Sequence, residues 1–326
     1  MPREVMRNIY RIPVPLPNNP LRELNCYLIR GKDRSLLIDT GFRQETCRRA
    51  LFDGLQELNV RMEDTDIFLT HLHSDHTGLL PEVASASSRV FIDDLDRDWI
   101  VGSTRFELER QEDARFAMAG IPPEMLRIAS QTHPGRCFAP DPSFDRYTRL
   151  SAGDVLEVGG YRLEVLRTPG HTPSHLCLWM AEQQVMFTGD HVLFDITPNI
   201  TRWPNLENAL GCYLRSLKQV REYDVKTALP AHRATGDFHA RVDALLRHHA
   251  YRLEECLKVV REEPGLLPFE IAGRMTWRIR AKNWEDFPIP QKWFAVGECL
   301  SHLDLLRLEG QVREELADGR LYYYPN

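Results

Sequence analysis

The stretch from Thr70 to Gly78, THLHSDHTG, places three histidines and one aspartate within nine positions. Imidazole and carboxylate groups lose hydration when they are buried, so a cluster of them at the end of an apolar run needs a common partner. The run itself, residues 66–70, is rich in apolar and β-favouring residues and predicts a short buried strand. The chain must therefore adopt a fold in which a buried strand ends at a polar site.

The spacing within this motif indicates metal binding. If the extended path continues beyond the strand, His71, His73 and Asp75 fall on one side of the chain, about 6.6 Å apart per pair. Two imidazoles at that spacing can hold one cation. Asp75 and the adjacent His76, beside a Thr-Gly turn, point to a second location close by. The motif predicts two neighbouring metal ions.

The composition is that of a globular protein with a full hydrophobic core. The chain has 326 residues, a mass of 37.8 kDa and 43% hydrophobic residues, enough for one large domain and a smaller one. A formal net charge of −6 and a pI near 6.1 give no whole-chain attraction to nucleic acid or anionic lipid. No stretch has the character of a signal peptide or a membrane span, so we expect a cytoplasmic protein without a membrane partner. The seven cysteines are scattered without a C-x-x-C pair, which indicates reduced thiols.

The first two thirds of the chain are predicted to form a layered α/β unit. Apolar runs at 25–29 and 36–39 flank a polar turn and predict a hairpin, and 45–58 has helical periodicity. Further strands are expected at 90–92, 161–166, 176–180, 185–188 and 227–229. A charged segment from about 95 to 131 indicates a helical insertion, and 136–147, rich in proline and aspartate, indicates a loop.

After residue 236 the pattern becomes helical, so we expect a catalytic domain at 1–236 and a smaller domain at 237–326. The second domain has predicted helices at 238–263, 268–277 and 291–309. A two-stranded ribbon with its turn at Asp318 and Gly319 follows them. Three helices and a ribbon are the order of a winged helix.

Three further predicted strands end in a residue of metal-ligand type. His171 follows a Thr-Pro-Gly turn, Asp190 follows a Thr-Gly pair and His232 follows a Pro-Ala pair. If these strand ends meet at one sheet edge, a single pocket collects all the candidate ligands. Lone histidines such as His133 and His239 are more typical of surface or core positions.

The candidate ligands divide into two sets of three, with one residue shared between them. They are His71, His73 and His171 for a first cation, Asp75, His76 and His232 for a second, and Asp190, whose two oxygens can bridge both.

These residues resemble the five motifs of the metallo-β-lactamase superfamily and are most similar to glyoxalase II. The resemblance covers about residues 8–236 and rests on H-x-H-x-D-H at 71–76, Pro-Gly-His171, Gly-Asp190, Ala-His232 and the early Leu-Ile-Asp39-Thr-Gly. It implies an αββα sandwich with a dinuclear zinc site at one edge and Asp39 beside the ligands. Iron or manganese are the alternative metals in glyoxalase II relatives. His175 and His191 either orient a ligand from behind or only line the pocket.

The C-terminal part resembles, in layout, the winged helix of the mitochondrial β-lactamase-like endoribonuclease and its bacterial relatives. His73 stands where flavin-linked diiron members of the superfamily have glutamate, which favours zinc over a redox diiron role. Pro173-Ser174-His175 replaces the common Gly-x-x-Gly-His, which is a mild departure from the motif.

The resemblance and the ligand set together predict a mechanism. Two divalent cations lower the pKa of a shared water toward about 7, which makes hydroxide available near neutral pH. We expect this metal-bridging hydroxide to attack a small carbonyl substrate, a thioester or a lactone. Asp75 or Asp190 would hold the nucleophile and accept its proton. The residues in segments that overhang the site are Trp99, Arg105, Tyr147, Arg202 and Trp203, and no substrate-binding residue is assigned.

A second hypothesis is a metal-dependent single-strand endoribonuclease or nucleic-acid-binding protein that uses the winged helix. Residues 237–326 contain 13 lysines and arginines against 15 aspartates and glutamates, a net charge of −2, which is poor for a phosphate-binding face. The cationic cluster there consists of Arg274, Arg278, Arg280 and Lys282. A small-molecule substrate is therefore the leading hypothesis. A homodimer through apolar patches on the winged helix stays open, and an inactive scaffold is disfavoured because every ligand position is filled.

Overall fold

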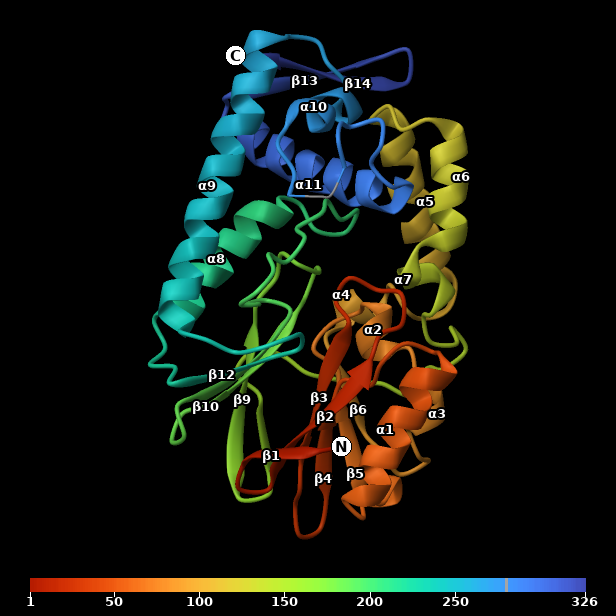
Figure 1. Ribbon diagram of the computed structural model, residues 1–326, viewed down its shortest axis with the longest axis vertical. Helices are drawn as coiled ribbons and strands as arrows, with labels where there is room; N and C mark the ends of the chain where they lie inside the picture. The colour runs from red at the N-terminus through yellow and green to blue at the C-terminus, as the bar shows by residue number, and fades with distance from the viewer. Residues whose placement is uncertain (279–280) are drawn as a thin grey trace.

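The computed structural model describes residues 1–278 and 281–326 and places two β-sheets face to face (Figure 1). The seven-stranded sheet runs in the order β1 (Arg3–Met6), β2 (Ile9–Pro15), β3 (Glu23–Ile29), β4 (Ser35–Ile38), β5 (Thr65–Phe68), β6 (Val90–Ile92) and β7 (Thr148–Arg149). The five-stranded sheet runs in the order β12 (Thr227–Pro230), β11 (Val185–Gly189), β10 (Leu176–Met180), β9 (Tyr161–Arg167) and β8 (Val155–Val158).

The core between the sheets follows from strands that are covered on both faces. All five residues of β10, Leu-Cys-Leu-Trp-Met, are buried. Because side chains alternate along a strand, Leu178 faces inward and packs in one cluster with Phe68 of the opposite sheet. Cys177 and Trp179 face outward and pack in the cluster beneath the helices.

Helices cover the two outer faces of this sheet pair. Side chains of α1 (Glu45–Glu57) and α3 (Leu80–Val83) pack with the seven-stranded sheet, and those of α8 (Ala209–Arg221) and α9 (Phe238–Glu262) pack with the five-stranded sheet. The layers are therefore helix, sheet, sheet, helix. The αββα sandwich predicted from the sequence is confirmed.

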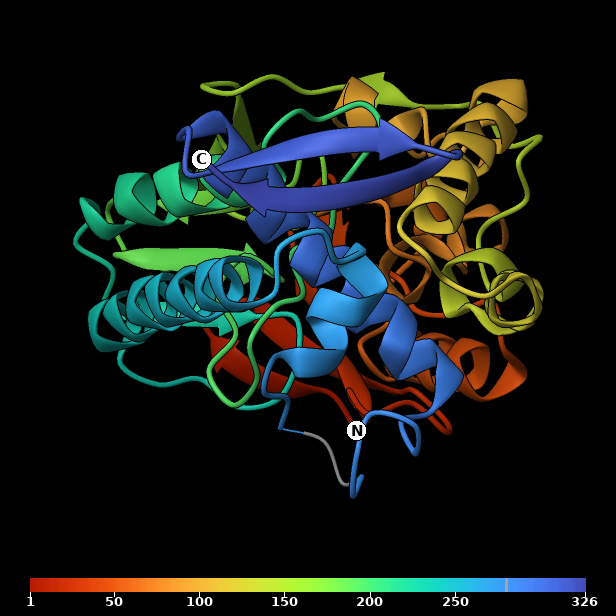
Figure 2. The same cartoon turned by 90° about the horizontal axis from the view of Figure 1, so that it is seen from above.

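A second hydrophobic core joins the inserted helices to the C-terminal segment. It contains side chains from α5 (Gly102–Met118), α6 (Pro123–Thr132), the end of α9, α10 (Pro268–Arg274), α11 (Ile289–Leu308) and the ribbon β13 (Val312–Ala317) and β14 (Arg320–Pro325). Phe116 of α5 stacks on Trp293 of α11 with ring centroids 3.9 Å apart. Figure 2 shows the ribbon lying over the insertion and α11. The short helices are η1 (Met62–Asp64), α2 (Ser74–Thr77), α4 (Asp94–Arg97) and α7 (Pro134–Cys137).

Some local predictions were wrong. The backbone does not stay extended through the motif, because α2 begins at Ser74 and places Asp75 on a helical turn. Helix α10 ends at Arg274 because Met275 adopts an extended conformation, and the segment predicted as a loop from residue 136 begins inside α7. Strands β1, β2, β7 and β8 were not predicted.

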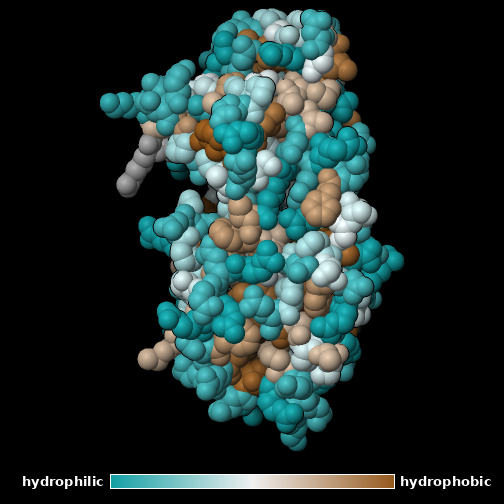
Figure 3. All heavy atoms as spheres, turned by 90° about the vertical axis from the view of Figure 1, so that its right-hand side faces the viewer, coloured by the Kyte–Doolittle hydropathy of each residue, from teal (hydrophilic) through white to brown (hydrophobic). Residues whose placement is uncertain are grey.

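The surface beside α5 and α6 is mostly hydrophilic, with apolar residues scattered over it (Figure 3). Over residues 1–278 and 281–326, no helix combines the length and apolarity that crossing a bilayer requires. All seven cysteines are unpaired in the part of the chain that the structure describes, as expected from their spacing.

The core between the sheets can be tested at Leu178, which is fully buried. We expect Leu178→Ala to lower the free energy of unfolding by about 2–5 kcal/mol, because the cavity cannot close between two sheets. Urea denaturation of the metal-free protein measures this change. Leu316→Ala is the matched control, since Leu316 is 63% exposed, and should change stability by less than about 0.5 kcal/mol. Equal changes in the two variants would contradict this account of the core.

Candidate metal centre

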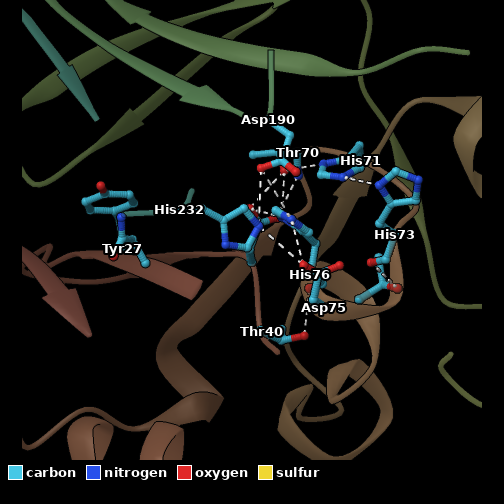
Figure 4. Close-up of polar contacts among 12 residues, drawn as sticks. Tyr27, Thr40, Thr70, His71, His73, Asp75, His76, Asp190 and His232 are labelled. Carbon is cyan, nitrogen blue, oxygen red and sulfur yellow. Dashed lines mark hydrogen bonds and ion pairs between the residues drawn. The ribbon is translucent and has the colours of Figure 1, made fainter. Parts of the chain in front are cut away.

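The two sheets bring the candidate ligands to one edge. Strands β4 and β5 are parallel neighbours, so Asp39 and His71, which follow them, leave the first sheet on the same side. Strands β11 and β12 are also parallel, so Asp190 and His232 leave the second sheet together. Strand β9 ends at the same edge, where the antiparallel β10 begins, and His171 lies in the connection between these two strands. Figure 4 shows ligand side chains from both sheets pointing toward one another.

The connection that carries His171 depends on a glycine. Gly170 has a φ of +137°, and a Cβ atom there would lie 2.4 Å from Cβ of Tyr213 on α8. Only glycine fits this turn. The glycine of the Pro-Gly-His sequence therefore lets the chain pass close to α8, and this turn places His171 at the sheet edge where the other ligands lie.

The first set of donor atoms comes from His71, His73, His171 and Asp190, all within 4.8 Å of one another. His73 Nδ1 lies 2.9 Å from His71 Nε2 and 3.1 Å from His171 Nε2. Oδ2 of Asp190 lies 3.5 Å from His171 Nε2. Three imidazoles and one carboxylate oxygen thus face a single point.

The second set comes from Asp75, His76 and His232, again within 4.8 Å. His232 Nε2 lies 3.3 Å from Asp75 Oδ2 and 3.4 Å from Asp190 Oδ1, and His76 Nε2 lies 3.7 Å from each of these oxygens. Ligands about 2.0–2.1 Å from a tetrahedral zinc ion are separated by about 3.3–3.4 Å. These atoms are spaced as ligands of one ion.

The second set is also chemically incomplete without an ion. Asp75 Oδ2, His76 Nε2, Asp190 Oδ1 and His232 Nε2 are buried, and none has a hydrogen-bond partner among the described residues. A buried polar group without a partner costs about 1–3 kcal/mol, and more if it is charged. Four such groups would use up much of a typical folding free energy of about 5–15 kcal/mol. The residues present therefore fit a bound cation.

Asp190 connects the two sets. Its Oδ2 faces His171 of the first set, and its Oδ1 faces His76 and His232 of the second. One carboxylate therefore presents one oxygen to each cluster, which is the arrangement of a bridging ligand.

Hydrogen bonds at the far side of each ring orient three of the histidines. Nδ1 of His76 donates to Asp39 (2.8 Å), Nδ1 of His171 donates to the Asn199 carbonyl (2.9 Å) and Nδ1 of His232 donates to the Glu23 carbonyl (2.8 Å). Each bond leaves Nε2 free to bind a metal, because a neutral imidazole carries its proton on one nitrogen. The family resemblance implied that Asp39 lies beside the ligands. In the structure, Asp39 lies behind the ring of His76.

The two sets differ in their charge balance. Burial and the neighbouring imidazoles lower the pKa of His71 and His73 well below the ordinary value. Burial opposes a charge on His76 as well, but the carboxylates of Asp39, Asp75 and Asp190 outweigh it and raise the pKa of His76 to about 9. The second set, rich in carboxylates, therefore holds a proton near neutral pH when no cation is bound.

The two histidines of undecided role take different places. His175 Nε2 accepts the backbone N–H of Asp190 at 3.1 Å, so His175 holds the bridging residue in position. Neither ring nitrogen of His191 has a hydrogen-bond partner within residues 1–278 and 281–326. The His191 ring packs 5.2 Å from that of Tyr213, which places it behind the site.

Sequence reasoning missed Asp96, which fastens two ligand loops together. Its buried carboxylate accepts hydrogen bonds from Leu72 N (3.0 Å), Thr172 Oγ1 (2.6 Å) and Ser174 N (2.7 Å). Leu72 lies between His71 and His73, and Thr172 follows His171. No motif marks Asp96, because its role depends on backbone groups that are distant in sequence.

Among the residues expected to overhang the site, Trp203 contacts the ligands directly and Trp99 packs against Trp203. Trp203 donates its indole N–H to the His171 carbonyl at 3.2 Å, and its ring lies 6.0 Å from that of His73. Trp99 packs against Trp203 at 4.9 Å. The other three residues make contacts elsewhere: Arg105 pairs with Glu109, Tyr147 packs on Phe144 and Arg202 pairs with Asp304.

His133 was treated as a lone histidine, yet its segment adjoins the metal ligands. The carbonyl of Pro134, the next residue, accepts a hydrogen bond from Ser74 Oγ at 2.9 Å. Burial lowers the pKa of His133 to about 4, so its imidazole is neutral. No sequence pattern linked residue 133 to the motif at 71–76.

A family model described as the metallo-beta-lactamase superfamily matches residues 20–232. The chain belongs to the metallo-β-lactamase superfamily. As a member, it is a hydrolase of the metallo-β-lactamase fold, and the two donor sets are the residues that could bind metal in it.

Relatives within the superfamily match the chain over most of its length. The probable metallo-hydrolase YqjP of Bacillus subtilis is 25% identical over 96% of this chain and 96% of its own. A metallo-beta-lactamase family protein from Thermus thermophilus has a similar solved structure, with a TM-score of 0.80 and 28% identity over 99% of this chain and all of that one. The solved structure of a beta-lactamase domain protein from Burkholderia ambifaria matches with a TM-score of 0.85. Its sequence identity is 26%, and the match covers 100% of this chain and 94% of that one.

A fungal relative has a more specific name. The atrochrysone carboxyl ACP thioesterase nsrC of Aspergillus novofumigatus is 26% identical over 74% of this chain and 59% of its own length. The chain therefore matches a little over half of that protein.

The charge balance of the second set predicts how cation binding depends on pH. Because the pKa of His76 is raised to about 9, a cation must displace that proton at neutral pH, so zinc affinity at this set should rise about tenfold per pH unit from pH 7 toward that pKa and then level. Competition with a chromophoric chelator measures this. Asp39→Asn removes the carboxylate that raises the pKa of His76 most, so it should move the steep range to lower pH. Affinity independent of pH between 7 and 9 would contradict the proton assignment.

The role of Asp96 predicts a selective loss. Asp96→Ala frees the donors at residues 72, 172 and 174, so cation affinity at the first set should fall about 10–100-fold. Zinc titration of the metal-free protein measures this affinity. Asp93→Ala is the matched control, since Asp93 caps α4 and pairs at 3.3 Å with Arg167 at the end of β9, whereas the hydrogen bonds to residues 72, 172 and 174 belong to Asp96. Equal losses in both variants would show that Asp96 has no special role.

Proposed function

We propose that the protein is a dinuclear zinc hydrolase of a small carbonyl compound, an acyl thioester or a lactone, in the manner of glyoxalase II. The observation that supports this most directly is the Asp190 carboxylate, with one oxygen facing each donor set. A carboxylate shared between two cations fixes their separation, and two cations held about 3.5–4 Å apart are a common arrangement in metal-dependent hydrolases.

The donor types support zinc as the metal. Imidazole nitrogens and carboxylate oxygens without thiolate suit zinc, with iron and manganese as alternatives. Bound divalent cations supply a water acidic enough to attack near neutral pH and polarise the substrate carbonyl.

The protein side chains have distinct parts in this reaction. The carboxylates of Asp75 and Asp190 are the acceptors for the proton that leaves the attacking water. Asp39 and His175 keep His76 and Asp190 oriented through the hydrogen bonds described above. His73, the most exposed of the candidate ligands, marks the side from which a substrate approaches.

One motif resemblance and one relative favour a thioester. The motifs resemble those of glyoxalase II, and the fungal relative nsrC is named an acyl carrier protein thioesterase. Trp203 beside His73, with Trp99 packed against it, would offer an apolar wall for an acyl group. We therefore place thioesters ahead of lactones.

Action on nucleic acid is the alternative. The C-terminal segment has three helices followed by a ribbon, the order of a winged helix. Arg274 of the cationic cluster pairs with Glu263 at 2.7 Å, which reduces its availability for phosphate, and Arg280 lies outside the described residues. We propose a packing role for this segment, a small-molecule substrate and a cytoplasmic location.

A substrate panel with one variant tests the proposal. The zinc-loaded protein should cleave acyl thioester or lactone reporters and should bind short RNA weakly. His73→Ala should lose at least one cation and at least about 100-fold in turnover, because the first set loses its central nitrogen. His239→Ala, which alters a histidine outside the site, is the control.

Two outcomes would contradict the proposed function. RNA cleavage at low protein concentration with tight, salt-sensitive binding would favour the nuclease. Unchanged turnover in His73→Ala, with metal content measured, would remove the metal centre from the reaction.

A further inference from the structure

The connection between β11 and α8 carries a segment, residues 195–208, that we call the bridging loop. It contacts the metal ligand His171 at two points. The Asn199 carbonyl accepts the Nδ1–H of His171 at 2.9 Å, and Trp203 donates to the His171 carbonyl at 3.2 Å. The position of the bridging loop therefore fixes both the ring and the backbone of His171.

The other side of the bridging loop rests on α11 of the C-terminal segment. Ser301 donates its hydroxyl to the Ile200 carbonyl at 2.5 Å. The side-chain amide of Asn199 lies 3.3 Å from the Phe294 carbonyl oxygen and 3.5 Å from Glu298 Oε2. Helix α11 thus makes hydrogen bonds to Asn199 and Ile200, two consecutive residues of the bridging loop beside His171.

Helix α11 and the bridging loop also approach each other closely at Gly297. A Cβ atom at this position would lie 2.3 Å from Thr201 Oγ1 and 3.2 Å from Thr201 Cβ. Threonine is short, so it can yield to such a contact only by rotating or by moving the loop backbone. A side chain at residue 297 therefore meets Thr201 of the bridging loop first, and Phe116 Cζ of the second hydrophobic core is its next contact at 3.3 Å.

Helix α11 is itself held firmly. Val296, Leu300 and Leu303 are fully buried in the second hydrophobic core. Glu298 pairs at 3.3 Å with Arg252 of α9, whose guanidinium lies 4.2 Å from the centre of the Trp277 ring. A helix anchored on both flanks can hold a loop in place.

We propose that α11 is a brace that positions His171, and that Gly297 and Ser301 are positioning residues which set the cation affinity of the first donor set. The second set does not depend on this brace. His76 is oriented by Asp39 and His232 by the Glu23 carbonyl, and both partners belong to the seven-stranded sheet or follow its strands. Disturbing α11 should therefore weaken one cation site and spare the other. This inference is independent of the substrate.

The test is zinc binding to the full-length, metal-free protein, measured by competition with a chelator so that two dissociation constants are obtained. Gly297→Ala should weaken one of them by about tenfold or more and leave the other within about twofold. Alanine favours a helix over glycine, so loss of helix stability does not account for such an effect. The control is Gly273→Ala in α10, where the new methyl group meets Trp284 instead of the bridging loop. It should leave both constants unchanged.

Three further variants fix the cause. Thr201→Ala combined with Gly297→Ala removes the closest contact and should restore part of the lost affinity. Ser301→Ala, which releases the loop without pushing it, should weaken the same site. In a His73→Ala background, where the first set is already broken, Gly297→Ala should not change the remaining dissociation constant.

The proposal is overturned by any of three results. The first is that Gly297→Ala and Ser301→Ala bind both ions as the unchanged protein does. The second is that both constants weaken together. The third is that the remaining site in the His73→Ala background responds to Gly297→Ala.

Discussion

The structure depends on a set of buried ligand atoms that a bound cation would satisfy together. Four of them, on Asp75, His76, Asp190 and His232, have no hydrogen-bond partner among the described residues and converge at 3.3–3.7 Å. Proteins seldom leave such groups unpaired, because the lost hydration is not recovered. In the described residues these unpaired atoms lie together at one edge of the two sheets, and binding of a cation would offset the lost hydration.

The rest of the fold serves to keep those atoms in place. Parallel strands deliver ligands from both sheets to the same edge, and the fixed partners of His76, His171 and His232 turn each Nε2 inward. Asp96 ties the two loops of the first set together from one side. Helix α11 supports the bridging loop from another. The C-terminal segment is thus part of the structure around the ligands, whatever else it does.

The sequence predicts the sandwich and the candidate ligands because both leave local signals. Buried strands are continuous apolar runs, and each ligand follows such a run, so the order of motifs could be read without a structure. The helical turn at Asp75 was missed because the extended conformation of the strand was assumed to continue to residue 75, whereas α2 begins at Ser74. Asp96, Asn199 and Gly297 could not be found, since they act through backbone carbonyls, amide groups and close packing between segments far apart in sequence. Such contacts have no periodicity and no characteristic residue type.

The most direct measurement of the central claim is a crystal structure of the metal-loaded protein, with anomalous scattering recorded at the zinc absorption edge. The account predicts two peaks, one among His71, His73 and His171 and the other among Asp75, His76 and His232, with one oxygen of Asp190 beside each. A single peak, or two peaks with Asp190 touching only one of them, would contradict the bridging arrangement on which the proposed reaction is built.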